Sequence, residues 1–344
     1  MKQHVLLEIL PSALTSLIVS ALLTGVMRQL ALTHRVLDVP NERSSHSTPT
    51  PRGGGLAIVI TLLAALWLLE IVGSLPFRLW AALSACGSAV ALVGFADDKW
   101  HLSAKTRLTV HFAAASVFVW SSGRLPPVDF GIAILNLGIA GSIVGVLALV
   151  WFLNLYNFMD GIDGIASIEA MTVASTAALF LVQHGGGSPV AVFMWLTVAT
   201  VGGFLLWNWP PARIFMGDAG SGFLGFILGA MAWSTAAAGK LSVWFWLILV
   251  GAFFVDATLT LLRRWRRGEP LATAHRSHAY QHLSRRFGSH LKVTLGVLMV
   301  NLLWLAPLAW LAALHPSYGA GLTLLAWAPL AVCAWRSRAG LPGE

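Results

Sequence analysis

Hydrophobic residues along this chain gather in long runs, and short polar segments separate the runs. A bilayer core of about 30 Å needs about 20 consecutive apolar residues in a helix. Eleven runs approach this length, and the fourth is the shortest. The runs lie near residues 7–29, 54–72, 78–96, 107–121, 131–153, 165–182, 189–207, 219–238, 242–262, 293–313 and 319–335. The pattern therefore predicts an all-α integral membrane protein of about 11 transmembrane helices, built as a single polytopic domain over residues 1–344.

Composition supports the membrane reading and excludes several classes of function. The chain is 57% hydrophobic and 10% charged, whereas soluble domains carry roughly 25% charged residues. Cys86 and Cys333 lie in apolar runs, so they offer no disulfide or zinc framework. Glu8 and Pro11 interrupt the first run, and its basic flank follows it, which argues against a cleaved signal peptide. Nucleic-acid binding, disorder and a disulfide scaffold all fit poorly.

Basic residues divide the polar segments into two unequal sets. One set holds Lys2, Arg78, Arg124 and Lys240, and the alternate segments hold the other 18 of the 22 Lys and Arg (22 − 4). Because basic loops stay in the cytoplasm, we expect a periplasmic N-terminus and a cytoplasmic C-terminus. The expected cytoplasmic loops lie near residues 30–53, 97–106, 154–164, 208–219 and 263–292.

Acidic residues gather on the same side as the basic ones. The acids at or beside the cytoplasmic ends are Asp38, Glu42, Asp97, Asp98, Asp160, Asp163, Asp218 and Glu269. Carboxylates hold divalent cations such as Mg²⁺, and cationic side chains hold the remaining phosphate charge. This one-sided distribution favours a site that handles a metal ion and phosphates.

The first motif is the pair Asp97-Asp98, where the third run meets the cytoplasm. Two adjacent ionised carboxylates repel each other, so the pair suggests a nearby cation or solvent. The alternative is an exposed helix end at which Asp98 caps the segment that follows. Taken alone, the pair favours that alternative.

The second motif places Asn154, Asn157, Asp160 and Asp163 at every third position before Gly164. Residues three apart are neighbours on a helix, so these side chains are expected to share a face. The glycines beside them suggest close backbone approach by a ligand. A polar cap and turn between two spans is the weaker interpretation.

The third motif runs from Asn208 to Gly222 and leads a glycine-rich loop into the eighth run. Helix N-termini favour bound phosphate, and Asp218 at this position would repel it unless a metal bridges them. Asp218 is therefore the preferred magnesium ligand, completed by phosphate oxygens and water. The alternative is an Asp cap on a packing helix, with Gly225 and Gly229 as a small-residue contact.

Two cytoplasmic loops carry further cationic groups. The loop near 263–292 contains an arginine run, which positive-inside topology explains, followed by Arg276 and His278. Arg and His clusters can clamp a diphosphate, so a role in substrate binding or catalysis is favoured for these two residues. The segment from Pro49 to Gly55 places Arg52 before three glycines, which suits an anion as well as it suits a structured connector.

In this order the motifs resemble those of the polyprenyl-phosphate N-acetylhexosamine-1-phosphate transferase family, which is glycosyltransferase family 4. The resemblance covers nearly the whole chain and rests on Pro49–Gly55, Asp97-Asp98, Asn157–Gly164, Phe215–Ser221 and Arg276–His278. Members start O-antigen and enterobacterial common antigen synthesis, form lipid I, or transfer GlcNAc-1-phosphate to dolichyl phosphate.

The resemblance implies a phosphotransferase of the bacterial inner membrane with its active site on the cytoplasmic face. It implies transfer of an N-acetylhexosamine-1-phosphate from a UDP-N-acetylhexosamine to undecaprenyl phosphate, with release of UMP and initiation of O-antigen or another cell-surface polysaccharide. Mg²⁺ is the implied cofactor, with Mn²⁺ as an alternative. The implied partners are these two substrates and membrane lipid, without nucleic acid, and a homodimer is left open.

Roles transfer only to matching positions. Asp218 resembles the main magnesium ligand, and Asn157 assists it or orients the diphosphate. Asp97 resembles the acid that deprotonates the lipid phosphate. The catalytic residues are expected to be Asp97, Asp98, Asp218 and His278. The substrate-binding residues are expected to be Arg52, Lys105, Asn157, Asp160, Asp163, Asn208 and Arg276.

The loop after Arg276 departs from the family pattern. O-antigen relatives often read Arg-x-His-x-His-His, whereas Tyr280 and Gln281 stand here and His282 follows one position later. The departure argues against the lipid I enzyme and leads to the hypothesis that the sugar is a 6-deoxy N-acetylhexosamine rather than GlcNAc.

A transporter or flippase remains the alternative from a different class of protein. Transporters place polar groups near the bilayer midplane, often in repeated halves. Here the acids lie at one face and no repeat is evident. Asp256 is the exception, about two turns before Arg263 within the ninth run, where a structural role is favoured over a role in the site.

Overall fold

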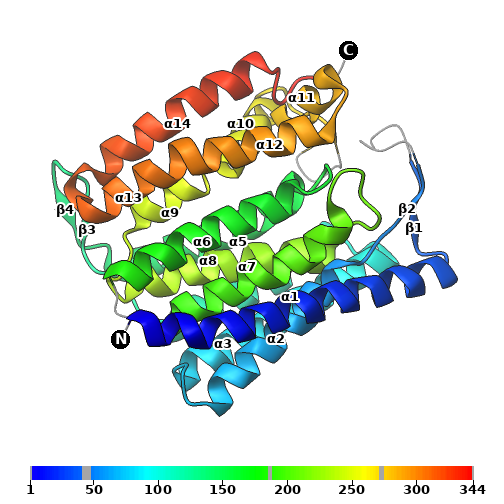
Figure 1. The fold of residues 1–344 in the computed structure, drawn as a ribbon. Helices are drawn as coiled ribbons and strands as arrows, with labels where there is room; N and C mark the ends of the chain where they lie inside the picture. Colours follow the sequence, from blue (N-terminus) through cyan, green and yellow to red (C-terminus); the bar gives the residue numbers. More distant parts are fainter. Residues whose placement is uncertain (1, 41–47, 185–187, 271–274, 343–344) are drawn as a thin grey trace.

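The computed structural model of this chain is a bundle of long helices with two small hairpins (Figure 1). It describes residues 2–40, 48–184, 188–270 and 275–342. The helices are α1 (Lys2–Thr33), α2 (Gly55–Ile71), α3 (Phe77–Trp100), α4 (Ala104–Ser121), α5 (Gly138–Met159), α6 (Ile165–His184), α7 (Pro189–Asn208), α8 (Asp218–Ala237), α9 (Val243–Leu249), α10 (Gly251–Arg266), α11 (Ala279–Phe287), α12 (His290–Val300), α13 (Ala306–Leu314) and α14 (Gly319–Arg336). Two short helical turns, η1 (Asn301–Leu305) and η2 (Pro316–Tyr318), adjoin α13. Strands β1 (Leu37–Asp38) and β2 (Thr50–Pro51) form one antiparallel hairpin, and β3 (Val128–Asp129) and β4 (Ile134–Leu135) form the other.

Within the described residues, eight helices are long and apolar enough to cross a membrane, and a ninth span results if the bent pair α9–α10 counts as one. Two further expected spans fall short of that standard. Helix α2 is apolar but has 17 residues, and α4 begins with the basic residues Lys105 and Arg107. The multi-pass helical class predicted from hydrophobic patterning is thus confirmed.

Helix α8 lies at the centre of the bundle and packs against α3 and α5. Close approach of the backbones requires glycine at these contacts. A Cβ at Gly229 would lie 2.5 Å from Leu149 of α5, and one at Gly94 would lie 2.7 Å from the backbone of Ala219. The small-residue contact at Gly225 and Gly229, which belonged to the alternative interpretation of this motif, is present, since Gly225 faces Leu153 of α5. These contacts set how closely α3 and α5 approach the start of α8.

Two expected spans were wrong in detail. The first residues of the run at 131–153 form the turn and second strand of the β3–β4 hairpin, because Asp129 Oδ1 accepts from Gly131 N at 2.8 Å and turns the chain. Helix α5 starts at Gly138 and extends to Met159, beyond the predicted end. The run at 242–262 is broken at Val250, where α9 and α10 meet at 76°. In addition, the loop expected over 263–292 contains helix α11.

The β1–β2 hairpin and α11 lie at one end of the bundle, and the β3–β4 hairpin lies at the other (Figure 1). Helices α3 and α5 end at the first of these ends, and α4 and α8 begin there. Residues far apart in the sequence are therefore brought together at that end.

Candidate functional site

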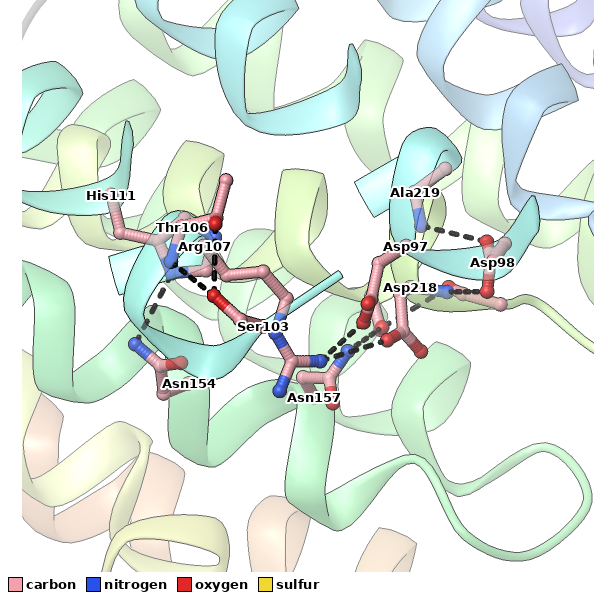
Figure 2. Close-up of polar contacts among 12 residues, drawn as sticks. Asp97, Asp98, Ser103, Thr106, Arg107, His111, Asn154, Asn157, Asp218 and Ala219 are labelled. Atoms are coloured by element: carbon pink, nitrogen blue, oxygen red, sulfur yellow. Dashed lines mark hydrogen bonds and ion pairs between the residues drawn. The ribbon is translucent and has the colours of Figure 1, made fainter. Parts of the chain in front are cut away.

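Three carboxylates meet where α3 ends and α8 begins (Figure 2). Asp98 accepts hydrogen bonds from the backbone N–H groups of Asp218 at 3.0 Å and Ala219 at 3.2 Å. A carboxylate in this position caps the N-terminus of a helix and complements its dipole. The capping alternative for Asp98 therefore applies, but the helix that it caps is α8 and not the segment that follows it. Ser103 caps that segment, α4.

Gly217 explains how this cap is built. It has a φ of +80° at the position before α8. A Cβ at this residue would lie 2.8 Å from Asp98 Oδ2. The glycine thus supplies both a left-handed backbone and the space for the Asp98 carboxylate.

Two guanidinium groups bind Asp218, one from the segment between β2 and α2 and one from α4. Arg52 Nη2 lies 2.5 Å from Asp218 Oδ1 and 2.8 Å from Asp98 Oδ1. Arg107 Nη1 bonds Asp97 Oδ2 and lies 3.5 Å from Asp218 Oδ2. Three acids and two cations therefore form one partly buried charge network.

Backbone hydrogen bonds between the segment after Arg52 and the loop before α8 position Arg52 at this network. Gly54 N and Gly55 N donate to the carbonyls of Phe215 and Met216, each at 2.9 Å. A Cβ at Gly55 would lie 2.4 Å from the Cα of Gly220. Although burial acts to lower it, the charges of Asp218 and Asp98 raise the pKa of Arg52. The segment is both a structured connector and the support of a cationic group.

Arg107 was missed by the sequence reasoning, which selected Lys105 instead. Lys105 is exposed at the start of α4, whereas Arg107, two residues later, points to the acids (Figure 2). The available signal was the position of Arg107 ten residues after Asp97, near the start of a helix that follows a short turn. A basic residue there can reach back to the helix before the turn.

Asn157 and Asp160 lie next to the charge network. Asn157, on the last turns of α5, donates from Nδ2 to Ser221 Oγ of α8 at 3.0 Å. Asp160 follows the end of α5, where burial and the charge of Asp218 raise its pKa well above the ordinary value. The helical spacing expected of four residues is confirmed for Asn154 and Asn157, which lie within α5, and is wrong for Asp160 and Asp163, because α5 ends at Met159.

Asp163 and Asn208 bond to the protein itself. Asp163 Oδ2 accepts from Ala212 N at 3.0 Å, and Oδ1 lies 3.1 Å from His290 Nδ1. Asn208 accepts from Gly164 N and donates to Ile214 O, both at 2.9 Å. These bonds fasten the α5–α6 loop to the α7–α8 loop, so both side chains position the loops around the network.

His278 lies beside the site without contacting the three acids. It is 2% exposed, with Nδ1 3.6 Å from Asp256 Oδ1 and its ring between those of His275 and Tyr280. Asp256 also accepts from Ala279 N at 2.8 Å and Tyr280 N at 3.0 Å, and so caps α11. The structure therefore gives Asp256 the structural role favoured for it.

The loop that carries His278 is docked against the α5–α6 loop. Tyr280 Oη donates to Phe158 O at 3.0 Å, and a Cβ at Gly161 would lie 2.1 Å from that hydroxyl. Arg276 is exposed at the entrance to α11. The motifs thus converge on one end of the bundle, but the acids at 97, 98 and 218 form its charged centre and His278 lies at its edge.

The C-terminal segment after α14 contacts the loop that carries His278. Gly340 N donates to Ser277 O at 2.7 Å, and Ala339 is fully buried. His282 Nε2 lies 3.2 Å from Leu341 O, and its Nδ1 lies 3.1 Å from Arg285 Nη2. Both ring nitrogens of His282 therefore have structural partners, which argues against its replacing a histidine of the family loop.

Replacing Gly340 with alanine is expected to loosen this contact. Gly340 has a φ of +76°, and a Cβ there would lie 2.7 Å from Thr260 O. A left-handed non-glycine residue costs about 1–3 kcal/mol, so Gly340→Ala should speed protease cleavage of the C-terminal segment and lower Tm in detergent. Gly268→Ala is the matched control, since Gly268 has a φ of +72° and open space around it. Equal cleavage of the two variants would contradict the docking role.

A groove of about 770 Å³ opens beside the charge network. Its polar end is lined by Arg107, His111, Asn154, Asn157 and Asp218, and leucine, phenylalanine, valine and tryptophan side chains of α4, α5 and α10 line the rest. An apolar groove that ends at cationic and acidic groups suits a ligand with a long hydrocarbon part and a charged head.

The donor atoms at the charged end are those that Mg²⁺ prefers, namely carboxylate and amide oxygens. Among the residues that the structure describes, no group of three His, Cys, Asp or Glu side chains is arranged to hold a metal ion. Mg²⁺ is usually held in proteins by one or two carboxylates together with substrate phosphates and water.

Comparison with known proteins agrees with this chemistry. A family model described as glycosyl transferase family 4 matches residues 80–236. The decaprenyl-phosphate N-acetylglucosaminephosphotransferase of Mycobacterium tuberculosis is 33% identical over 333 residues, which cover 87% of this chain and 80% of the relative. A Bacillus subtilis protein named probable undecaprenyl-phosphate N-acetylglucosaminyl 1-phosphate transferase is 26% identical, covering 87% and 84%. The phospho-N-acetylmuramoyl-pentapeptide-transferase of Gluconobacter oxydans is 32% identical, covering 65% and 68%.

Proposed function

This chain belongs to the polyprenyl-phosphate N-acetylhexosamine-1-phosphate transferase family, and from that premise we propose its reaction. The chain is a phosphotransferase, as its relatives are named. The proposed reaction moves N-acetylhexosamine-1-phosphate from a UDP-sugar to undecaprenyl phosphate and releases UMP. It requires Mg²⁺, with Mn²⁺ as a substitute.

The groove beside Asp218 is the observation that carries this proposal. A polyprenyl phosphate combines a long hydrocarbon chain with an anionic head, and the groove joins an apolar channel to Arg107 and Asp218. Arginine donors match phosphate oxygens in pairs. The lipid therefore enters sideways between α4, α5 and α10, while the UDP-sugar arrives from water at the end that holds Arg52 and Asp160.

The charge network fits a magnesium site. Asp218 faces two guanidinium groups, which shows that its oxygens are directed toward positive charge. Asn157 uses its Nδ2 on Ser221, so its Oδ1 remains for a ligand. Asp218 and Asn157 would hold the ion together with phosphate oxygens and water. When bound, Mg²⁺ supplies neutralisation of the diphosphate charge.

Particular side chains are proposed to bind the lipid phosphate and to accept its proton. Asp97 accepts the proton of the lipid phosphate, and Arg107 holds the phosphate oxygens. An oxygen of the lipid phosphate then forms a bond to the sugar-side phosphorus of the UDP-sugar. The bond from that phosphorus to the bridging oxygen breaks, and UMP leaves. Positioning and charge neutralisation supply most of the rate in such transfers, and a single displacement needs no covalent enzyme intermediate.

We propose a membrane placement that follows the positive-inside rule. The 344 residues form a single polytopic domain of 11 spans in the bacterial inner membrane, with a periplasmic N-terminus and a cytoplasmic C-terminus. The acids at 97, 98 and 218 then face the cytoplasm, where UDP-sugars are made. The product would initiate O-antigen or another cell-surface polysaccharide.

The donor sugar is proposed to be GlcNAc, with a 6-deoxy N-acetylhexosamine as the alternative. The names of the relatives from M. tuberculosis and B. subtilis support GlcNAc. The alternative rests on Tyr280 and Gln281 in place of histidines. Both residues have structural bonds here, to Phe158 O and His278 N, so their presence does not by itself require a different sugar.

Two other functions fit less well. Formation of lipid I is supported by the relative from G. oxydans, but that match covers 65% of this chain against 87% for the M. tuberculosis relative. Transport or flipping lacks support among these relatives, all of which are named transferases. The convergence of the acids at one end of the bundle also disfavours a midplane transport site.

Incubation of membranes with undecaprenyl phosphate, Mg²⁺ and labelled UDP-N-acetylhexosamines tests the proposal. We expect UMP release and a labelled lipid with UDP-GlcNAc, and neither without the lipid phosphate. Preference for a 6-deoxy donor would overturn the choice of GlcNAc. Uptake of a solute without UMP release would overturn the enzymatic proposal.

Replacing Arg107 with glutamine is expected to lower kcat/KM about 100-fold, which is about 2.7 kcal/mol of transition-state stabilisation. The substitution leaves Asp97 without its guanidinium partner and removes a phosphate donor. Arg107→Lys should retain part of the rate, because it keeps the charge but not the paired donors. The measurement is UMP release, with Thr109→Ala, two residues later on α4, as control. Full activity of Arg107→Gln would contradict the role of Arg107.

A further inference from the structure

His111 lies one turn after Arg107 on α4 and lines the same groove. Residues four apart share a helix face, so both side chains border the path of the charged head. His111 is 7% exposed and belongs to none of the motifs in the sequence. A buried polar ring in the wall of an apolar groove needs a partner or a ligand.

The amide of Asn154 fixes the hydrogen positions on this ring. Asn154 Nδ2 donates to Val150 O at 2.7 Å and lies 3.4 Å from His111 Nδ1 (Figure 2). The opposite amide orientation would place Oδ1 against the Val150 carbonyl, and two acceptors repel. Nδ2 is therefore the atom that faces His111, and its second hydrogen points to Nδ1.

The tautomer of His111 follows from this contact. An Nδ1 atom that accepts a hydrogen bond carries no hydrogen, so the neutral ring carries its hydrogen on Nε2. Within the described part of the chain, Nε2 has no hydrogen-bond partner and is not among the fully enclosed polar atoms. The ring thus presents a fixed N–H donor in the groove.

We propose that His111 is a substrate-positioning residue whose Nε2–H donates to the phosphate of the polyprenyl acceptor. This inference rests on the proposed function and adds a residue to its lipid subsite. Arg107 offsets the negative charge of the phosphate. His111 orients the phosphate through a directional hydrogen bond, because Asn154 holds its ring in one tautomer. The groove continues from His111 along apolar side chains of α4 and α5, which assigns the donor to the lipid rather than to the nucleotide.

Three substitutions separate this role from simple packing. His111→Gln places an amide nitrogen near the position of Nε2, His111→Asn places one near Nδ1, and His111→Phe keeps the ring without either nitrogen. We expect His111→Phe and His111→Asn to raise KM for undecaprenyl phosphate about 10-fold, which corresponds to about 1.4 kcal/mol. KM for the UDP-sugar and kcat should stay within about threefold. His111→Gln should keep a KM for undecaprenyl phosphate near the wild-type value, because its amide nitrogen retains the hydrogen bond to the charged phosphate.

The outcomes distinguish the two proposals. A wild-type KM for undecaprenyl phosphate in all three variants would overturn the role of His111 and leave the transferase function intact. An equal rise in the KM values for undecaprenyl phosphate and for the UDP-sugar would indicate a packing role and would also overturn the role of His111. The same conclusion would follow if His111→Gln raised KM for undecaprenyl phosphate as much as His111→Asn does. If His111→Phe does not fold, the comparison of the two amide variants still decides, because both keep a polar side chain. Absence of UMP release by the wild-type protein would overturn the transferase proposal itself.

Discussion

Asp218→Asn is expected to reduce turnover by at least about 1000-fold while the protein still inserts into the membrane. The substitution keeps the shape of the side chain and removes its charge. Asp218 is the acid that both guanidinium groups approach, Arg52 at 2.5 Å and Arg107 at 3.5 Å. Without its charge, the network holds two cations against two acids, and the proposed magnesium ligand is lost.

The Asp218→Asn experiment needs a measure of folding beside the measure of rate. UMP release and formation of the lipid-linked sugar give the rate, and the amount of protein in the membrane with its elution profile in detergent gives the folding. Glu70→Gln is a matched control, because it also removes a carboxylate but lies in the last turn of α2, away from the three acids. Robust turnover by Asp218→Asn would refute the role given to Asp218.

Removal of divalent cations with EDTA is expected to reduce activity by a similar factor, on the order of 1000-fold. The physical reason is the charge of the two substrates. A lipid phosphate and a diphosphate must approach each other, and the three acids that pair with Arg52 and Arg107 offset much of the positive charge of these two cations. Added Mg²⁺ should restore the rate, and Mn²⁺ should restore it in part or in full.

Thermal stability provides a second readout for the metal. A ligand that binds only the folded state raises stability by RT ln(1 + [L]/Kd). Mg²⁺ together with UMP should therefore raise Tm of the wild-type protein in detergent and should have less effect on Asp218→Asn. Full activity in EDTA, or an equal rise in Tm for both proteins, would contradict a metal ion at Asp218.

Prediction from sequence succeeded where a single stretch of chain decides the outcome. Apolar runs of about 20 residues identified the helices, and Asn154 and Asn157 were correctly placed on one helix face. It failed where distant segments intervene. The run at 131–153 is mostly apolar, yet the turn at Gly131 and the contact of Trp244 Nε1 with Asp129 O, at 2.7 Å, make its first part a strand of a hairpin. The roles of particular residues in the reaction stay predictions from resemblance.

The sequence by itself determined the class of protein and the end of the bundle at which the acids gather. Hydropathy and charge are properties of each residue, and the bilayer sorts them along the chain whatever the packing. Only the tertiary structure decided which acid meets which cation. Asp98 caps α8 across 120 positions of sequence, and Arg52 reaches Asp218 across 166. Such contacts depend on how closely helices pack, which glycines such as Gly94 and Gly55 permit, so no local pattern could reveal that Arg52 meets Asp218 or that His111 meets Asn154.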